Sequence, residues 1–347
     1  MPSNHLIRPI RRCAAITGFV ARLVTTMLVL TTATVGLPAH ALPADTHTET
    51  ADAGMIVRRL PGLVLPSLGS EVAAARIRGE NLNWWDDATR WFRGRPEGRQ
   101  EADGSFDELQ LNLCDSGFAG CYRGGAAVLE GGNLVYDLAP DVVTVNEICL
   151  NAVQDYLQPS LALAWPNDRT FYVFVPAWDR RTNGPYKCRN GYDYGNVVIG
   201  RVPAASYRGI HSWAGIYAAQ DPGDYEERTF GCAYVIGEHL VCVTHLAAHN
   251  PPTALAQCQE LMLSAVPAIS SAERLSGRTV VGGDLNLEYD PADPDNAQTC
   301  VPAGFTRKGD GALQHVTFSD DLGFESTTAY PMTQTDHDAF LVRMAMT

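Results

Sequence analysis

Strand-like and helix-like patterns alternate along the chain from Phe106 onward. Short runs rich in Val, Ile, Thr and aromatic residues end at turn-forming residues, which is the pattern of buried strands. Such runs predict strands at 107–114, 141–149, 170–177, 196–201, 229–236, 239–245, 279–284, 313–319 and 339–344. Helical patterns are found at about 122–138, 150–164 and 253–273. This mixture predicts an α/β fold, a four-layer α/β/β/α sandwich of two mainly antiparallel sheets flanked by helices, in a domain spanning 106–347.

Residues 1–41 do not follow this pattern. Three arginines lie among the first 12 residues, the run 23–37 is mostly apolar, and Ala39-His40-Ala41 has the small residues of a cleavage site. This is the layout of an export signal, so we expect a signal peptide at 1–41 and a secreted, extracellular protein without a membrane span in its mature form. The alternative is an uncleaved membrane anchor, which the shortness of the run and its threonines disfavour.

Residues 42–105 are interpreted as an N-terminal extension and linker. The part from 42 to 53 is polar and rich in threonine. A helical pattern at 70–93 carries three tryptophans, which we expect to pack on the main body rather than to contact carbohydrate or a membrane. The stretch 93–100 is rich in Arg and Gly, which is typical of a linker.

The composition is that of a folded protein, with 46% hydrophobic and 19% charged residues. The net charge is −13, and it becomes −17 without residues 1–41, which contain four arginines and no acidic residue. A chain this acidic is not expected to bind nucleic acid through its general electrostatic field. A metal-dependent nuclease stays open, because bound cations and a few local arginines can meet a phosphate.

The cysteines favour disulfides. Eight of the nine remain once Cys13 is removed with the signal peptide, and an even number in an exported protein indicates pairing. No two of them have the C-x₂-C spacing of a zinc ribbon. The sequence does not fix the connectivity, but Cys232 and Cys242 flank a predicted hairpin turn, and Cys114 and Cys121 bracket a short Gly-containing loop.

The conspicuous polar residues of the main body follow or end predicted strands, where functional sites are usually assembled. They are Asn112, Glu147, His245, Asp284, Asn286, Asp336 and His337. Each has an ordinary structural interpretation by itself, as a solvated loop residue, a turn residue or a surface hydrogen-bonding pair. Their order along the chain is what carries the argument.

In that order, the residues resemble the motif succession of the endonuclease/exonuclease/phosphatase superfamily, the family of pancreatic deoxyribonuclease I. The matching segments are Asn112, Glu147, Gly195-Asn196, Thr244-His245-Leu246, Gly283-Asp284-Leu285-Asn286 and Asp336-His337. Six motifs in the family's order are a specific signal. The resemblance covers about residues 106–345, and residues 1–105 take no part in it.

The resemblance implies a phosphodiester hydrolase that depends on Mg²⁺, with Mn²⁺ as an alternative and Ca²⁺ as a candidate structural ion. Mg²⁺ prefers oxygen ligands. By resemblance, its ligands are Glu147, Asn112 and Asp336. We expect the protein to be a monomer.

The remaining roles follow from the same resemblance. Hydrolysis of a phosphodiester requires an oriented water molecule and the neutralisation of charge. Asp284 is expected to orient and deprotonate the water, and Asn286 to donate to a phosphate oxygen or hold the adjoining ligand. His245 and His337 are expected to bracket the phosphate. Two further residues are assigned to substrate binding, Arg228 and Asn196.

One position departs from the family pattern. The family has an Asp at the start of the penultimate strand, where its carboxylate orients the catalytic imidazole, and Gln314 stands in that place. A Gln carbonyl can accept from the ring N–H but brings no negative charge, so the imidazolium is less stabilised. We therefore expect reduced activity, or an acid limb of the pH–rate profile at lower pH that Gln314→Asp would move upward.

The substrate is less constrained than the chemistry. A sphingomyelinase, phospholipase C or inositol-type phosphatase of this fold is one alternative, and the apolar segment 207–217 is either its lipid-contacting loop or, as we prefer, a packed insertion. Another alternative is a weakly active binding or toxin-subunit protein. The loop 178–195 gathers Arg180, Arg181, Lys187 and Arg189 with two tyrosines, which favours nucleic acid and an endonuclease.

Overall fold

The computed structural model describes residues 49–50, 56–59 and 104–346. The expected signal peptide at 1–41 and the expected helix at 70–93 lie outside the described residues. Among the residues that are described, none forms a helix long and apolar enough to cross a membrane.

One sheet of the sandwich has six strands, in the order β16-β17-β3-β4-β8-β5. Their bounds, in this order, are Leu322–Tyr330, Ala339–Met346, Ser105–Asn112, Val142–Cys149, Tyr194–Pro203 and Asp168–Pro176. All neighbours are antiparallel except β3 and β4, which run parallel.

The second sheet has eight strands, in the order β1-β2-β9-β11-β12-β13-β15-β14. Their bounds, in this order, are Glu49–Thr50, Ile56–Arg59, Ile210–Ile216, Thr229–Val235, His239–His245, Thr279–Asp284, Gln314–Ser319 and Phe305–Gly309. Its single parallel pair is β12 and β13. The expected extension at 42–105 therefore contributes two short strands, β1 and β2, at one side of this sheet. Strand β2 pairs with β9, and β1 pairs with β2.

A third, small sheet lies in the loop that carries the basic residues. Its order is β10-β6-β7, with bounds Glu226–Glu227, Trp178–Asp179 and Gly184–Pro185. This sheet joins the loop 178–195 to the segment that leads into β11.

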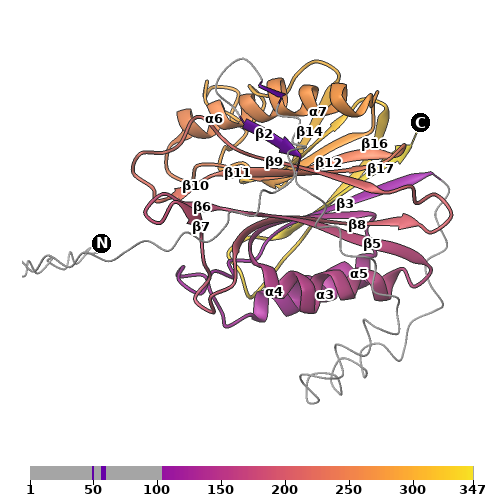
Figure 1. The fold of residues 1–347 in the computed structure, drawn as a ribbon, viewed down its shortest axis with the longest axis horizontal. Helices are drawn as coiled ribbons and strands as arrows, with labels where there is room; N and C mark the ends of the chain where they lie inside the picture. Colours follow the sequence, from indigo (N-terminus) through magenta and orange to yellow (C-terminus); the bar gives the residue numbers. More distant parts are fainter. Residues whose placement is uncertain (1–48, 51–55, 60–103, 347) are drawn as a thin grey trace, which may run out of the picture. The chain divides into compact units, whose positions relative to one another are not determined.

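Helices cover the outer face of each large sheet (Figure 1). On the six-stranded sheet they are α3 (Ala126–Leu138), α4 (Leu150–Ala152), the π-helical turn η1 (Val153–Leu157) and α5 (Gln158–Ala164). On the eight-stranded sheet they are α6 (Pro251–Glu260), the π-helical turn η2 (Leu261–Ala265) and α7 (Val266–Glu273). The predicted α/β/β/α sandwich is confirmed.

The hydrophobic core has three layers that follow from this arrangement. Between the two sheets, buried side chains such as Val142 and Val173 of one sheet share a cluster with Val241, Val280 and Val316 of the other. The two remaining large clusters fill the spaces between each sheet and its helices. Burial of such apolar surface is the main stabilising contribution to a fold of this kind.

All eight cysteines of the described domain form disulfides. The two pairs expected from local spacing, Cys114–Cys121 and Cys232–Cys242, are present. The other two are Cys149–Cys188 and Cys258–Cys300, with sequence separations of 39 and 42 residues. Four disulfides are consistent with an extracellular protein.

The nine predicted strands and three helical regions are all found, with boundaries that differ by a few residues. Three longer strands were not predicted, β9, β14 and β16. The segment 207–217, interpreted as a packed insertion or a lipid-contacting loop, contains β9, which lies between β2 and β11 inside the sheet. The segment is therefore not a free loop, because strand pairing holds it on both sides.

Candidate active site

Two parallel strand pairs, one from each sheet, define the rim on which the site is built. In the six-stranded sheet β3 and β4 bring Asn112 beside Asn146, and in the eight-stranded sheet β12 and β13 bring His245 beside Asp284. The carboxyl ends of parallel strands meet at one edge of a sheet. Stacking the two sheets then places both edges together.

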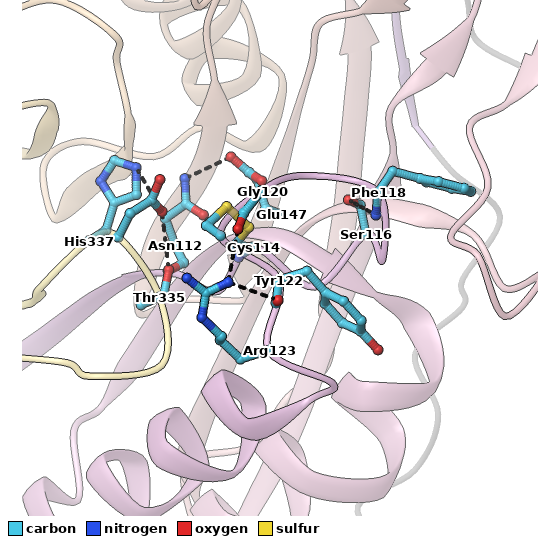
Figure 2. The surroundings of a disulfide bond; sticks show 12 residues. Asn112, Cys114, Ser116, Phe118, Gly120, Tyr122, Arg123, Glu147, Thr335 and His337 are labelled. Carbon is cyan, nitrogen blue, oxygen red and sulfur yellow. Dashed lines mark hydrogen bonds and ion pairs between the residues drawn. A yellow bond between two sulfur atoms is a disulfide. The ribbon is translucent and has the colours of Figure 1, made fainter.

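Asn112 lies between two carboxylates that come from different sheets. Its amide nitrogen donates to Glu147 Oε1 at 3.1 Å and to Asp284 Oδ2 at 3.0 Å. Its carbonyl oxygen accepts from the backbone N–H of Cys114 at 3.2 Å. Figure 2 shows the contact between Asn112 and Glu147 next to the disulfide of Cys114.

Glu147 reaches the site through an irregularity in β4. The pairing of β4 with β8 shifts register between Val145 and Ile148, and Glu147 has a φ of +55°, which is strained for a residue with a side chain. Burial raises the pKa of its carboxyl group, and the hydrogen bond from Asn112 partly offsets this. Backbone strain of this kind persists only where the surrounding structure enforces it.

Two imidazoles face the same carboxylates. His245 Nε2 lies 3.9 Å from Asp284 Oδ2 and 4.0 Å from Glu147 Oε1, and His337 Nε2 lies 3.5 Å from Asp284 Oδ2. Burial holds the pKa of His245 well below its usual value, with Arg228 and His337 adding to the effect. His245 is therefore neutral at physiological pH and can donate one N–H or accept at one ring nitrogen.

The backbone around Asp284 is fixed from both sides. Its N–H donates to Asn146 Oδ1 at 2.7 Å, and its own Oδ1 accepts from the N–H of Asn286 at 3.0 Å. The Asn286 amide donates to the carbonyl of Leu246 at 3.0 Å. Burial raises the pKa of Asp284, and the nearby His337 partly offsets the rise.

Arg228 brings a positive charge near this group of residues, since it contributes to the electrostatics of Glu147, His245 and Asp284. It is buried, with Nη1 3.0 Å from Glu226 Oε1 and Nη2 3.6 Å from Asp224 Oδ2. Burial raises the pKa of Glu226 to about 7, an effect that Arg228 reduces. Two carboxylates thus hold the guanidinium in place at the wall of the site.

These residues surround a cavity of about 350 Å³. Its lining is Ser116, Phe118, Ala119, Glu147, Tyr186, Tyr194, Glu226, Arg228, His245, Ala248, Asp284, Asn286 and His337. Six of the nine residues singled out from the sequence line it, and Asn112 contacts two of them from below. The convergence expected from the order of the motifs is therefore observed in space.

Besides Asn112, two of the expected site residues do not line the cavity. Asn196 is buried beneath it, where its side-chain oxygen accepts from Asn146 at 2.9 Å. Asp336 has 60% of its side chain exposed, and its Oδ1 lies 3.8 Å from His337 Nε2. It also lies close to Cys114 and Cys121, whose sulfur atoms are joined in a disulfide.

Asn146 was missed in the sequence, although it directly precedes Glu147. It accepts from Asp284 N and from Gln110 Nε2 at 2.8 Å, and it donates to Asn196 and to the carbonyl of Thr244 at 2.8 Å. Two of these partners, Gln110 and Asn196, belong to the six-stranded sheet, and the other two, Asp284 and Thr244, belong to the eight-stranded sheet. Asn146 therefore ties the ends of both parallel pairs together.

A chain of buried polar side chains continues from Asn146 into the sandwich. Because the backbone N–H of Asp284 can only donate, Asn146 presents its oxygen there, and Gln110 must donate to that oxygen. The Gln110 oxygen then faces Thr144, whose single hydroxyl hydrogen it accepts. Glu108 also bonds the Thr144 hydroxyl, so Glu108 must be the donor and must carry a proton.

The environment of Glu108 agrees with this deduction. The side chain is fully buried between the sheets, and burial raises the pKa of Glu108 to about 8. The chain also explains a glycine of β13. A Cβ on Gly282 would lie 2.1 Å from Thr144 Oγ1 and 2.4 Å from Glu108 Oε1.

Gln314 belongs to the same polar chain and has different partners from those expected. It is fully buried, its oxygen accepts from Gln110 Nε2 at 3.3 Å, and its amide donates to the carbonyl of Asp338. The Gln314 amide thus links β15 to the backbone of Asp338, the residue after His337. The Gln314 carbonyl oxygen accepts from Gln110.

The donor set fits a divalent metal ion. Glu147 and Asp284 are two buried carboxylates that both bond the same Asn112 amide, and the charge of Asp284 adds to the effect of burial in raising the pKa of Glu147. Buried carboxylates in this arrangement need a compensating positive charge. Hard cations such as Mg²⁺ prefer carboxylate and amide oxygens.

The sequence matches the model of one protein family. The model of the Endonuclease/Exonuclease/phosphatase family matches residues 132–337. No curated protein sequence gives a significant match.

Three solved structures illustrate the likeness in fold. An endonuclease/exonuclease/phosphatase family protein from Bacteroides thetaiotaomicron is 10% identical, with a TM-score of 0.47 over 70% of this chain and 98% of that chain. Truncated TDP2 from Caenorhabditis elegans is 15% identical, with a TM-score of 0.45 over 70% and 98%. ANGEL2, a 2′,3′-cyclic phosphatase, is 11% identical, with a TM-score of 0.49 over 73% and 99%.

Proposed function

Because the chain belongs to the endonuclease/exonuclease/phosphatase family, we propose that it is a secreted, metal-dependent phosphodiester hydrolase that acts on nucleic acid or its components. The observation that carries the proposal is the meeting of Glu147, Asp284 and Asn112 from two sheets within hydrogen-bond distance. Phosphoryl transfer needs positioning and charge neutralisation above all, and this group supplies both.

Asp284 is the proposed general base. Its Oδ1 is held by the Asn286 N–H, and its Oδ2 faces His337 Nε2 at 3.5 Å. A carboxylate whose pKa is raised by burial is a stronger base than one in water, which favours removal of a proton from the attacking water. His337 then orients the phosphate and donates to an oxygen as negative charge develops.

The other polar residues have supporting roles in this proposal. Neutral His245 donates a hydrogen bond to the phosphate, and Arg228, anchored by Glu226, supplies a fixed positive charge at the wall. Glu147 would hold a divalent cation, with exposed Asp336 as a further ligand. Asn112 would join them by turning toward the ion its side-chain oxygen, which accepts from the N–H of Cys114 in this structure. When bound, that cation would neutralise phosphate charge and stabilise the leaving oxygen.

The choice of substrate has a narrower basis. The apolar segment that would favour a phospholipase is strand β9 and is paired on both edges. Among the alternatives, a weakly active binding protein would retain the fold without turnover. Plasmid DNA, RNA, sphingomyelin and inositol phosphates, each with Mg²⁺ and with EDTA, separate these candidates.

The catalytic proposal is tested with three variants on bis(p-nitrophenyl) phosphate. Asp284→Ala and His337→Ala should each lower kcat by about 10²-fold or more, because each removes an acid–base or charge-stabilising group. Glu147→Gln should raise the Mg²⁺ concentration needed for half-maximal activity. Asp293→Asn, an exposed carboxylate outside the cavity, is the matched control. Unchanged turnover and unchanged Mg²⁺ dependence in Glu147→Gln would contradict the ligand assignment.

A further inference from the structure

Aromatic side chains form one wall of the catalytic cavity. Phe118, Tyr186 and Tyr194 all line it. Tyr194 is buried and Tyr186 is half-buried, with ring centroids 5.7 Å apart. Phe118 differs from both, because 60% of its surface is exposed although it lies at the mouth of a polar site. An exposed aromatic ring that lines a polar cavity offers a flat apolar face to a ligand in that cavity.

The loop that carries Phe118 is held firmly. The Cys114–Cys121 disulfide closes it, the N–H of Phe118 donates to Ser116 Oγ at 3.2 Å, and the N–H of Arg189 donates to the Ser116 carbonyl at 2.9 Å. Figure 2 shows the Phe118 ring directed away from the disulfide, on the same loop. The ring is therefore presented in a fixed position before any ligand arrives.

Arg189 contributes to this presentation. Its guanidinium carbon lies 5.3 Å from the centroid of the Phe118 ring, within the range of a cation–π contact. The loop and Arg189 are tightly packed, since a Cβ on Gly117 would lie 2.7 Å from Arg189 Cβ. Arg189 thus supports the ring that reaches into solvent.

The charges around the cavity disfavour recognition along a polyanionic backbone. Three of the four basic residues of the loop 178–195 are paired within the protein: Arg180 with Glu227 at 3.1 Å, Arg181 with Asp179 at 3.0 Å, and Lys187 with Asp193. Arg228 is paired with Glu226 as well. Affinity for a polymer through counterion release depends on cations that are free to meet phosphates. We therefore expect van der Waals and stacking contacts with the substrate to supply much of the binding free energy.

We propose that Phe118 and Tyr186, which line the same cavity, form a subsite for a nucleobase, and that the substrate is a phosphodiester carrying an unstacked base, as in a nucleotide ester or single-stranded nucleic acid. The inference rests on the proposed function and names its substrate class. Flat aromatic side chains bind bases by stacking, whichever base is present. The Glu226 carboxylate in the same cavity accepts hydrogen bonds from N–H or O–H groups, as a nucleoside offers.

Two esters with the same leaving group test the subsite. The p-nitrophenyl ester of thymidine 5′-monophosphate carries a base, and methyl p-nitrophenyl phosphate does not, so both report on one reaction. Stacking on one side chain gives about 5- to 150-fold in affinity. Phe118→Ala should therefore lower the ratio of kcat/KM for the thymidine ester to that for the methyl ester by about this factor, mainly through KM.

The controls separate stacking from a general loss of structure. Phe118→Trp should keep the ratio, because it preserves an aromatic face. Phe324→Ala removes an exposed aromatic ring on β16, outside the cavity, and should change neither ester. An unchanged ratio in Phe118→Ala would overturn the inference.

Binding alone distinguishes this inference from the proposed function. If the wild type hydrolyses neither ester with Mg²⁺, the proposed function fails, and calorimetry with thymidine 5′-monophosphate decides the subsite by itself. Weaker binding in Phe118→Ala than in the wild type supports the subsite. Equal binding, or no binding to either protein, refutes it.

Discussion

Replacement of Glu108 by Gln tests the proton that the buried hydrogen-bond chain requires. Glu108 keeps its proton in the folded protein up to a pKa of about 8, whereas the unfolded chain loses it near the ordinary value of 4.5. Below about pH 4.5 Glu108 is protonated in both the folded and the unfolded state, so its ionisation does not change the free energy of unfolding. As pH rises from there to about 8, the unfolded state gains an ionised carboxylate that the folded state does not, so stability is lost throughout this window.

The expected size follows from the two pKa values. Each pH unit inside the window lowers the free energy of unfolding by up to about 1.4 kcal/mol. Between pH 5 and pH 7 the wild type should therefore lose about 2 to 3 kcal/mol that Glu108→Gln does not lose, because Gln cannot ionise. A constant offset of about 1 to 3 kcal/mol accompanies the variant, since the second amide hydrogen of Gln has no partner at this place.

Urea unfolding at pH 5, 6, 7 and 8, with disulfides intact, measures the difference between variant and wild type. Other titrating groups cancel in this difference. Glu325→Gln, on the exposed face of β16, is the control for the loss of one carboxylate. If the difference in unfolding free energy between the variant and the wild type stays constant from pH 5 to pH 8, Glu108 is not protonated in the folded protein. The hydrogen-bond directions deduced for the chain from Glu108 to Asp284 would then be wrong as well.

Two further substitutions probe the same interior. Gly282→Ala should destabilise the fold by about 1 to 3 kcal/mol in urea unfolding. The reason is that a Cβ at this position would lie 2.1 Å from Thr144 Oγ1 and 2.4 Å from Glu108 Oε1. A variant as stable as the wild type would mean that the two sheets can move apart at this place. Gln314→Asp should also destabilise, since a carboxylate cannot donate to the Asp338 carbonyl as the Gln amide does. If Gln314→Asp shifts the pH–rate profile without lowering stability, the residue at position 314 acts on the catalytic imidazole, as expected from the sequence.

The sequence predicted the fold where strands are buried on both faces. β12 and β13 are continuous apolar runs, and their bounds were found without error. β14 and β16 were missed because Phe305–Gly309 contains two cations and most of Leu322–Tyr330 is exposed, so neither has a strong hydrophobic period. β9 was missed because its Gly and Ser residues interrupt the pattern.

The candidate site was predictable for a different reason. Asp284, Asn286 and His245 sit directly at strand ends in recognisable motifs, so their convergence needed only the correct topology. Phe118 and Tyr186 come from loops, and Glu226 lies in the two-residue strand β10. The paths of these segments depend on disulfides and on the small sheet of β6, β7 and β10. No periodicity in the chain encodes those contacts.

The position of Asn112 between Glu147 and Asp284 has a wider consequence. Since the two carboxylates belong to different sheets, their separation is set by how far one sheet has slid over the other. A change of side-chain volume in the layer that holds Val142, Val241 and Val316, far from any substrate, would alter that offset. Activity should therefore respond to repacking of this interior layer as sensitively as to changes at the rim.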